Sequence, residues 1–305
     1  MKPKLVFLVG PTAIGKTKVA VLLAKKLNAE IISCDSMQVY KNMDIVTSKP
    51  GCALRKMVKH HLIDIISPVV EYNVSKYRRE AIKKIGEIVN KGKLPLFVGG
   101  TGLYRSILID GIFKQKAQNK LIRSRLFKQA KKFGSTYLYK RLEKIDPEAA
   151  GKIHPNDTKR LVRALEVFEA SGEPISKLQK QRRGLADEYD IKIFCLNMER
   201  DKLYQRIDKR VDKMFEDGVE KEVKKLLKLK LSRTAKYAIG IRELKGYFAG
   251  EYDLAEANRL IKRNSRLYAK RQLTWFRKDK RISWINIAKK ETPERISKRI
   301  WKELS

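Results

Sequence analysis

The residues with the clearest chemical potential lie near the N-terminus, where eight consecutive residues match the pattern GxxxxGK[ST]. They are Gly10, Pro11, Thr12, Ala13, Ile14, Gly15, Lys16 and Thr17. The glycines permit a tight loop, and its backbone N–H groups can surround an anionic phosphate group. Lys16 adds a positive charge, and the Thr17 hydroxyl can reach a Mg²⁺ ion. The pattern therefore predicts a binding site for a di- or triphosphate.

A phosphate-binding loop of this kind needs a strand before it and a helix after it. Lys4–Val9 is short and apolar, which is typical of a buried strand, and Lys16–Leu27 has apolar residues at helical spacing. A second helix is expected over Val74–Asn90. Further strands are expected at Glu30–Cys34, Leu94–Val98, Ile191–Leu196 and Ile282–Ile287. This alternation predicts an α/β fold, a P-loop NTPase-like parallel sheet flanked by helices.

The segment 113–187 differs from the sequence on either side of it. It is charged and amphipathic, with helical spacing almost throughout, and a strand pattern returns only after it. We therefore predict an all-helical insertion at 113–187. Residues 1–112 and 188–305 would together form the α/β core, with a mostly helical C-terminal part.

Composition narrows the class of protein. The 305 residues are 43% hydrophobic, which is ample for a buried core and excludes global disorder. The 70 Lys and Arg against 34 Asp and Glu leave a net charge of +36, which favours a polyanionic partner such as nucleic acid. A lysine-rich solvated surface is the alternative. Cys34, Cys52 and Cys195 show no zinc or disulfide spacing, and no apolar run approaches the ~18 residues that cross a membrane.

The position of the acidic residues bears on what the phosphate site does. An NTPase needs a carboxylate at the end of another strand, for Mg²⁺ and for orienting water. Leu94–Val98 is followed by Gly99-Gly100-Thr101, without an acid, and the strand-end carboxylate is Asp35. Asp35 could therefore act on a substrate, or it could cap the N-terminus of a helix.

Two arginines share one face of an expected helix. Arg206 and Arg210 stand four residues apart in the helix expected after Ile191–Leu196, so their side chains point the same way. Side chains with a common direction could contact one ligand. Alternatively, they could lie on a solvated face and pair with Asp208 or Asp212.

Taken together, the motifs resemble those of the tRNA dimethylallyltransferases, also called tRNA isopentenyltransferases, of the bacterial type. The matching residues are Gly10–Thr17, Asp35–Tyr40, Met43-Asp44, Thr47–Pro50, His60–Asp64, Gly99–Tyr104, His154–Asp157, Arg160, Arg163–Val167 and Ala269–Phe276. They follow the family order over nearly the whole chain. Because the chain stops soon after Trp301, we expect no C-terminal zinc finger of the kind found in eukaryotic relatives.

The resemblance implies a reaction and its partners. The enzyme would transfer the dimethylallyl group of dimethylallyl diphosphate to N6 of the tRNA adenosine that lies directly 3′ of the anticodon. The products would be N6-isopentenyladenosine and diphosphate, and Mg²⁺ would be the cofactor. The expected partners are the tRNA anticodon stem-loop and the isoprenoid diphosphate, without a membrane. We expect a cytoplasmic monomer.

The resemblance also implies roles for individual residues. Asp35 would be the general base, with Thr101 beside it. The phosphate loop and Arg210 would bind the diphosphate, and Thr17 would hold the metal. The residues expected to contact tRNA are Asp35, Ser36, Met37, Gln38, Thr101, Arg123, Lys159, Arg160, Leu161, Val162 and Arg163, the last five carried over as one segment of the helical insertion.

Two further groups have competing interpretations. Aromatic and basic residues alternate around Trp275, which could serve base stacking, but Leu267, Arg271 and Trp275 at spacing four indicate a core stripe instead. We favour the core stripe. His60 and His61 are interpreted as structural, because no third ligand with metal-site spacing accompanies them.

Three other functions fit parts of the sequence. An adenylate isopentenyltransferase would act on free AMP or ADP, but it would not need the helical insertion. A P-loop ATPase or small-molecule kinase would need an acid where Gly99-Gly100-Thr101 stands. An RNA-binding protein with a vestigial loop would not need Asp35 and Thr101.

Overall fold

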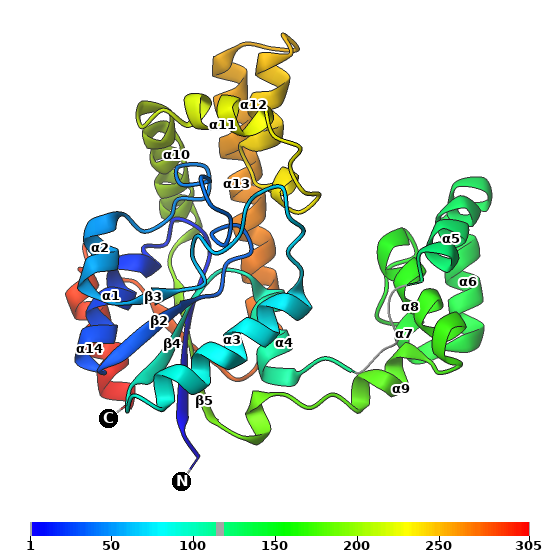
Figure 1. The fold of residues 1–305 in the computed structure, drawn as a ribbon, viewed down its shortest axis with the longest axis horizontal. Coiled ribbons are helices and arrows are strands. Elements are labelled where there is room, and N and C mark those ends of the chain that lie inside the picture. The colour runs from blue at the N-terminus through cyan, green and yellow to red at the C-terminus, as the bar shows by residue number, and fades with distance from the viewer. Residues whose placement is uncertain (1, 114–118, 305) are drawn as a thin grey trace. The chain divides into compact units, whose positions relative to one another are not determined.

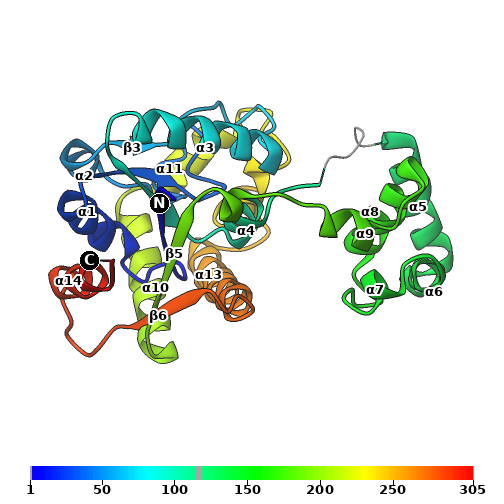
Figure 2. The same cartoon turned by 90° about the horizontal axis from the view of Figure 1, so that it is seen from below.

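The computed structural model describes residues 2–113 and 119–304. The chain forms two compact units, one from Met1–Leu108 with Glu188–Ser305 and the other from Ile109–Asp187. Figures 1 and 2 show the elements of each. In the described part of the chain, no helix has both the length and the apolar character needed to cross a membrane.

The first unit is built on a six-stranded sheet in which every neighbouring pair of strands is parallel. The spatial order is β3-β2-β4-β1-β5-β6. The strands are β1 (Lys4–Val9), β2 (Ala29–Ser33), β3 (His60–His61), β4 (Leu94–Gly99), β5 (Asp190–Asn197) and β6 (Ile282–Asn286). The predicted α/β fold is confirmed. The sequence interpretation missed β3, because two residues carry no detectable period.

Helices flank this sheet and extend beyond the carboxyl ends of its strands (Figure 1). They are α1 (Lys16–Lys26), α2 (Cys52–Met57), α3 (Val74–Val89), α4 (Gly102–Asp110), α10 (Arg200–Glu216), α11 (Val219–Leu227), α12 (Ile241–Phe248), α13 (Leu254–Arg277) and α14 (Pro293–Leu304). Helix α4 continues two residues into the second unit. Helix α1 packs against α14, and α10 packs against α13.

The central strands bring several loops to one edge of the sheet. Strand β1 lies between β4 and β5, and its residues Leu5–Leu8 are fully buried. Val9 pairs with Gly99 at the end of β4, which in turn lies beside β2. Because parallel strands end at the same edge, the segments that follow β1, β2 and β4 converge there. These segments carry the phosphate-binding pattern, Asp35 and Thr101.

The second unit is helical where it is described. It contains α5 (Lys120–Phe133), α6 (Ser135–Ile145), α7 (Pro147–Ala150), α8 (Thr158–Ser171) and α9 (Ile175–Lys180). Asn119 caps α5, and Asp157 caps α8 by accepting a hydrogen bond from the Arg160 N–H group. Leu126, Leu138 and Leu165 belong to its buried core, which is separate from that of the sheet unit.

The predicted core stripe on α13 is wrong. The side chains that α13 buries are Ala257, Ile261, Ser265, Ala269, Gln272 and Phe276. Leu267 and Trp275 remain 42% and 39% exposed. The surface that packs against α13 determines which face of the helix is buried, and the size of the side chains does not. Small and polar side chains fit at this contact. Trp275 instead lies against Gly102, where a Cβ atom would be 2.8 Å from the indole ring.

Candidate active site

The phosphate-binding pattern forms the turn between β1 and α1. Gly15, at the N-cap of α1, has φ 99°, a left-handed conformation that glycine adopts without strain. Lys16 Nζ donates to the carbonyl oxygens of Gly10 and Pro11 at 2.9 and 2.8 Å, so the lysine folds back across its own loop. The loop therefore combines a helix N-terminus with a half-buried ammonium group, an arrangement suited to binding an anion.

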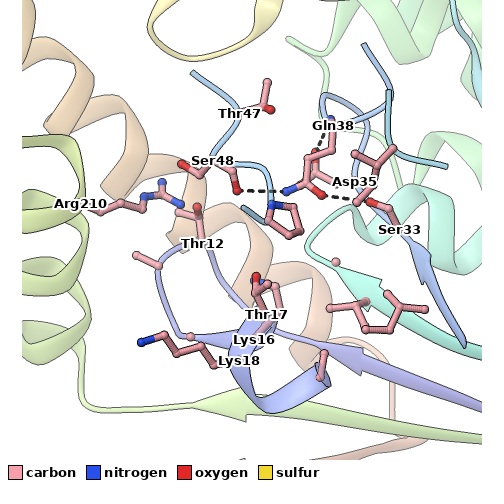
Figure 3. Close-up of a pocket in the computed structure, with 18 of the residues that line it drawn as sticks. Thr12, Lys16, Thr17, Lys18, Ser33, Asp35, Gln38, Thr47, Ser48 and Arg210 are labelled. Atoms are coloured by element: carbon pink, nitrogen blue, oxygen red, sulfur yellow. Dashed lines mark hydrogen bonds between the residues drawn. The ribbon is translucent and has the colours of Figure 1, made fainter. Parts of the chain in front are cut away.

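This loop borders a cavity of about 580 Å³. Figure 3 shows Lys16 and Thr17 of α1, Asp35 from the segment after β2 and Arg210 of α10 approaching it. The polar and charged lining residues are Thr12, Lys16, Thr17, Lys18, Ser33, Asp35, Gln38, Thr47, Ser48, His60, Arg206, Lys209 and Arg210. Of the predicted loop residues, Ala13 and Gly15 also line the cavity, whereas Ile14 is buried in the core. Among the described residues of the lining, Asp35 is the one carboxylate.

Asp35 lies two residues after the end of β2, where a turn begins, and not at the start of a helix. Its Oδ1 accepts hydrogen bonds from the N–H groups of Met37 and Gln38, at 2.9 and 3.4 Å. The helix-cap interpretation is therefore wrong, although the carboxylate does close a turn. One oxygen fixes the side chain, and the hydrogen bonds of the described chain leave Oδ2 for a ligand.

Thr101 is tied to the same turn. Its Oγ1 accepts a hydrogen bond from the Ser36 N–H group at 3.1 Å, and its own N–H group donates to Cys34 O at 3.2 Å. Burial raises the pKa of Tyr268, while a hydrogen bond to Thr101 acts in the opposite direction. The structure thus brings Asp35 and Thr101 together at the carboxyl edge of the sheet.

Gln38 connects the turn to a second loop over the cavity. Its Oε1 accepts from Ser33 Oγ at 3.1 Å, and its Nε2 donates to Ser48 O at 3.4 Å (Figure 3). Glu222 of α11 holds the neighbouring segment 44–46 by accepting three backbone hydrogen bonds at 2.9 to 3.0 Å. The loop over residues 44–48 is thereby held by Gln38 at one end and by Glu222 at the other.

The two arginines of α10 both reach the cavity. Asp208 pairs with Arg266, and Asp212 pairs with Lys262, so the alternative in which these acids bind Arg206 and Arg210 is wrong. Arg206 Nη1 donates to the Ile14 carbonyl oxygen of the phosphate loop at 3.2 Å. In the described part of the chain, the buried Nε of Arg210 has no hydrogen-bond partner. An anion in the cavity could supply one.

The cavity is electropositive, and this affects its own lysine. Burial lowers the pKa of Lys16 to about 8; Asp35 acts against this shift and Arg210 adds to it. Burial also lowers the pKa of Arg210, while Asp35 raises it. Five cationic side chains line the cavity against the one carboxylate of Asp35. The excess favours a ligand with several negative charges.

We predict that an alkyl diphosphate binds more weakly as pH rises above about 8. Bound diphosphate favours protonated Lys16, so its pKa is higher in the complex than the value of about 8 in the free protein. Between these two pKa values binding takes up a proton, and Kd rises by up to ~10-fold per pH unit. Calorimetric titrations of the protein with the alkyl diphosphate from pH 7 to 9.5 measure this Kd. Lys16→Arg stays charged throughout and should show a flat profile; equal losses in both proteins contradict the prediction.

The predicted RNA-contacting residues of the second unit lie on α5 and α8. Arg123 and Arg163 both contact Glu166, a fully buried carboxylate, at 3.5 and 3.1 Å. Arg160 is largely exposed and pairs with Asp157 at 3.2 Å. Lys159 is exposed on the same helix.

One correction applies within this segment. Leu161 and Val162 are fully buried in the core of the helical unit, so their side chains offer no surface to RNA. The prediction assigned the whole segment 159–163 to RNA contact. Because one face of a packed helix is buried and the other exposed, such a segment also includes residues that face the core.

Several residues at the site were not predicted. Lys18, Ser33 and Lys209 line the cavity but belong to no motif that would assign them. Thr47 and Ser48 lie in the matching segment Thr47–Pro50, but no role was predicted for them. Lys18 and Lys209 could have been found from their neighbours in the loop and on α10. His61 pairs with the buried carboxylate of Glu30 at 2.7 Å, and the His60 ring contacts Val58 O. Within the described residues, no cluster of three or more His, Cys, Asp or Glu could hold a metal.

Comparison with known proteins gives a consistent result. The family model for IPP transferase matches residues 38–279. A tRNA dimethylallyltransferase of Carboxydothermus hydrogenoformans is 48% identical over 98% of this chain and 97% of its own length. A crystal structure of tRNA isopentenylpyrophosphate transferase from Bacillus halodurans is 41% identical, with a TM-score of 0.73, and covers 99% of this chain and 97% of that one. A eukaryotic dimethylallyltransferase acting on tRNA is 29% identical, with a TM-score of 0.79, over 93% of this chain and 74% of that one.

Proposed function

The chain belongs to the IPP transferase family, and from this premise we propose that it is a tRNA dimethylallyltransferase. It transfers the dimethylallyl group of dimethylallyl diphosphate to N6 of the tRNA adenosine directly 3′ of the anticodon. The products are N6-isopentenyladenosine in tRNA and diphosphate. We further propose a cytoplasmic enzyme, because tRNA is found there, acting as a monomer, because one chain carries all the residues that the chemistry uses.

The observation that carries the proposal is the convergence of an anion site and a lone carboxylate on one cavity. Lys16 and Arg210 line the same space as Asp35, and Thr101 is joined to the Asp35 turn. An ATPase would need a carboxylate at the end of another strand for Mg²⁺ and for orienting water, whereas Gly99-Gly100-Thr101 provides no acid at the end of β4. A group transfer from a diphosphate to a nitrogen nucleophile needs only a base and stabilisation of the leaving group.

Asp35 serves as the base in this proposal. The exocyclic amine of adenine is a weak nucleophile, because its lone pair is delocalised into the ring. As the nitrogen attacks C1 of the dimethylallyl group, Asp35 takes the N6 proton, and the C–O bond to diphosphate breaks. Such general-base assistance contributes roughly 10²–10⁴-fold to the rate. The Oδ1 contacts to Met37 and Gln38 keep the carboxylate in place.

The phosphate loop and Arg210 stabilise the leaving group. Negative charge on the diphosphate grows in the transition state, and fixed cations and N–H groups lower the energy of that charge. Mg²⁺ fits the oxygen ligands of this cavity, where the Thr17 hydroxyl would hold it together with substrate phosphate oxygens and water. It would supply additional positive charge to the diphosphate.

The RNA partner is proposed to be the anticodon stem-loop. Bases in a single-stranded loop can leave the stack and be read at their edges, at a cost of a few kcal/mol. Ser36, Met37 and Gln38 directly follow Asp35, the proposed general base. The Gln38 amide can hydrogen-bond the edge of the target adenine. The exposed Lys159 and Arg160 at the start of α8, with Arg163 and Arg123, are proposed to contact RNA phosphates.

The test is a transfer assay with purified protein and Mg²⁺. Dimethylallyl diphosphate is supplied with unmodified tRNA in one reaction and with AMP in another, and nucleosides are analysed by mass spectrometry. We expect a five-carbon gain on adenosine in tRNA alone. Gain on AMP alone would indicate an adenylate isopentenyltransferase. ATP hydrolysis without any prenylation would indicate an NTPase.

A further inference from the structure

A buried glutamine from a distant part of the chain joins two segments of the candidate site. Gln272 of α13 is 5% exposed. Its Oε1 accepts a hydrogen bond from the Thr12 N–H group at 2.9 Å, and its Nε2 donates to Gly100 O at 2.9 Å. Both ends of one amide group are therefore used, each on the backbone of a different loop.

One of the two loops belongs to the proposed leaving-group site, and the other belongs to the proposed acceptor site. Thr12 belongs to the phosphate loop, where the leaving group would bind. Gly100 immediately precedes Thr101, which accepts from Ser36 next to the proposed base Asp35. Hydrogen bonds thus link the phosphate loop through Gln272 to Gly100, and the adjacent Thr101 continues the link to the acceptor side. Only a side chain with both an acceptor and a donor at this spacing can complete it.

The backbone at Gly100 is shaped to this contact. A Cβ atom on Gly100 would lie 2.0 Å from Gln272 Nε2, far inside van der Waals contact. Even alanine at position 100 would therefore push the amide away from the Gly100 carbonyl. The tight approach indicates that glycine at this position and glutamine at 272 depend on each other.

We propose that Gln272 is a positioning residue that sets the distance between the diphosphate site and the acceptor site. The inference rests on the proposed prenyl transfer. Gln272 acts through Thr12 and Gly100 and does not touch the reacting atoms. Transfer rates depend steeply on such alignment, and a ~1 Å displacement can cost about 10²-fold.

A double-mutant cycle tests this mutual dependence. Gln272→Ala and Gly100→Ala should each lower the single-turnover rate of prenyl transfer about 10²-fold at saturating substrates. The double variant should be no slower than either single variant, because the shorter side chain at position 272 leaves room for the new methyl group. The Kd for tRNA should stay within threefold in all three. Ser265→Ala, which trims another buried polar residue of α13, should retain the wild-type rate within twofold.

Hydrogen exchange supplies a readout that does not depend on activity. Gln272→Met fills the same volume without a hydrogen bond, and the Thr12 amide should exchange faster in it than in wild type and in Ser265→Ala. This variant also guards against misfolding of Gln272→Ala. Unchanged exchange, single-variant losses below threefold, or losses that multiply in the double variant would each overturn the proposal. Absence of tRNA prenylation in the wild type would refute the proposed function instead, and the exchange result would still decide whether Gln272 holds the loop.

Discussion

Replacing Asp35 with asparagine will lower the rate of prenyl transfer roughly 10²–10⁴-fold while tRNA binding remains within threefold of wild type. Asparagine has the same shape, and its carbonyl oxygen can still accept the hydrogen bonds that Met37 and Gln38 donate to Oδ1. The turn is therefore retained. What is lost is the ability to take a proton from the attacking amine. Single-turnover kinetics with saturating substrates measures the rate, and filter binding measures the Kd.

Asp253→Asn is the matched control for this experiment. Asp253 also accepts a backbone hydrogen bond, from Glu256 N at 2.8 Å, as the N-cap of α13. Asparagine is an equally good cap, so this variant should be as active as wild type. If Asp35→Asn were also as active as wild type, the general-base role would be refuted. If it lost tRNA affinity as strongly as rate, Asp35 would act in binding instead.

Replacing Arg210 with methionine will reduce the transfer rate roughly 10²–10³-fold and weaken binding of dimethylallyl diphosphate. The guanidinium lines the cavity, and its Nε lacks a protein hydrogen bond in the described chain, so the substrate is its expected partner. Rates are measured at saturating diphosphate, and Kd by calorimetry. Arg200→Met removes an exposed arginine from the same helix, 79% exposed in its side chain, and should leave both quantities unchanged.

Stability will not follow activity in Arg210→Met. Burial lowers the pKa of Arg210, which means that the folded protein disfavours its charge. An uncompensated charge in such a site costs free energy, and an apolar side chain of similar length removes that cost. The Tm of Arg210→Met should therefore equal or exceed that of wild type. A fall in Tm together with the fall in rate would mean that Arg210 is structural.

The parts of the site that could be predicted from the sequence are those in which chemistry and spacing are local. The phosphate loop is eight consecutive residues, and Asp35 is the carboxylate that follows a strand pattern. Arg206 and Arg210 share one helical face, so their common direction follows from spacing alone. In each case, a short stretch of sequence carries the whole signal.

The rest depends on which surfaces meet in the fold. Gln272 stands 260 residues from Thr12, and no period relates the two. The buried face of α13 includes Ser265 and Gln272 and leaves Trp275 half exposed, so a stripe of large side chains gave the wrong face. Strand β3 has two residues and forms only because β2 offers an unpaired edge. Contacts of this kind are set by tertiary packing, which overrides local preference.

The central place of β1 has a consequence for synthesis of the protein. Residues 4–9 leave the ribosome early, yet one of the two neighbours of β1 is β5, which begins at Asp190. Gln272 of α13, which accepts the hydrogen bond from Thr12, follows Thr12 by 260 residues. At ~5–20 residues per second, the nascent phosphate loop waits for tens of seconds without its closing contact. A chain that terminates before α13 would therefore contain the complete phosphate-binding motif Gly10–Thr17 and still lack an ordered site.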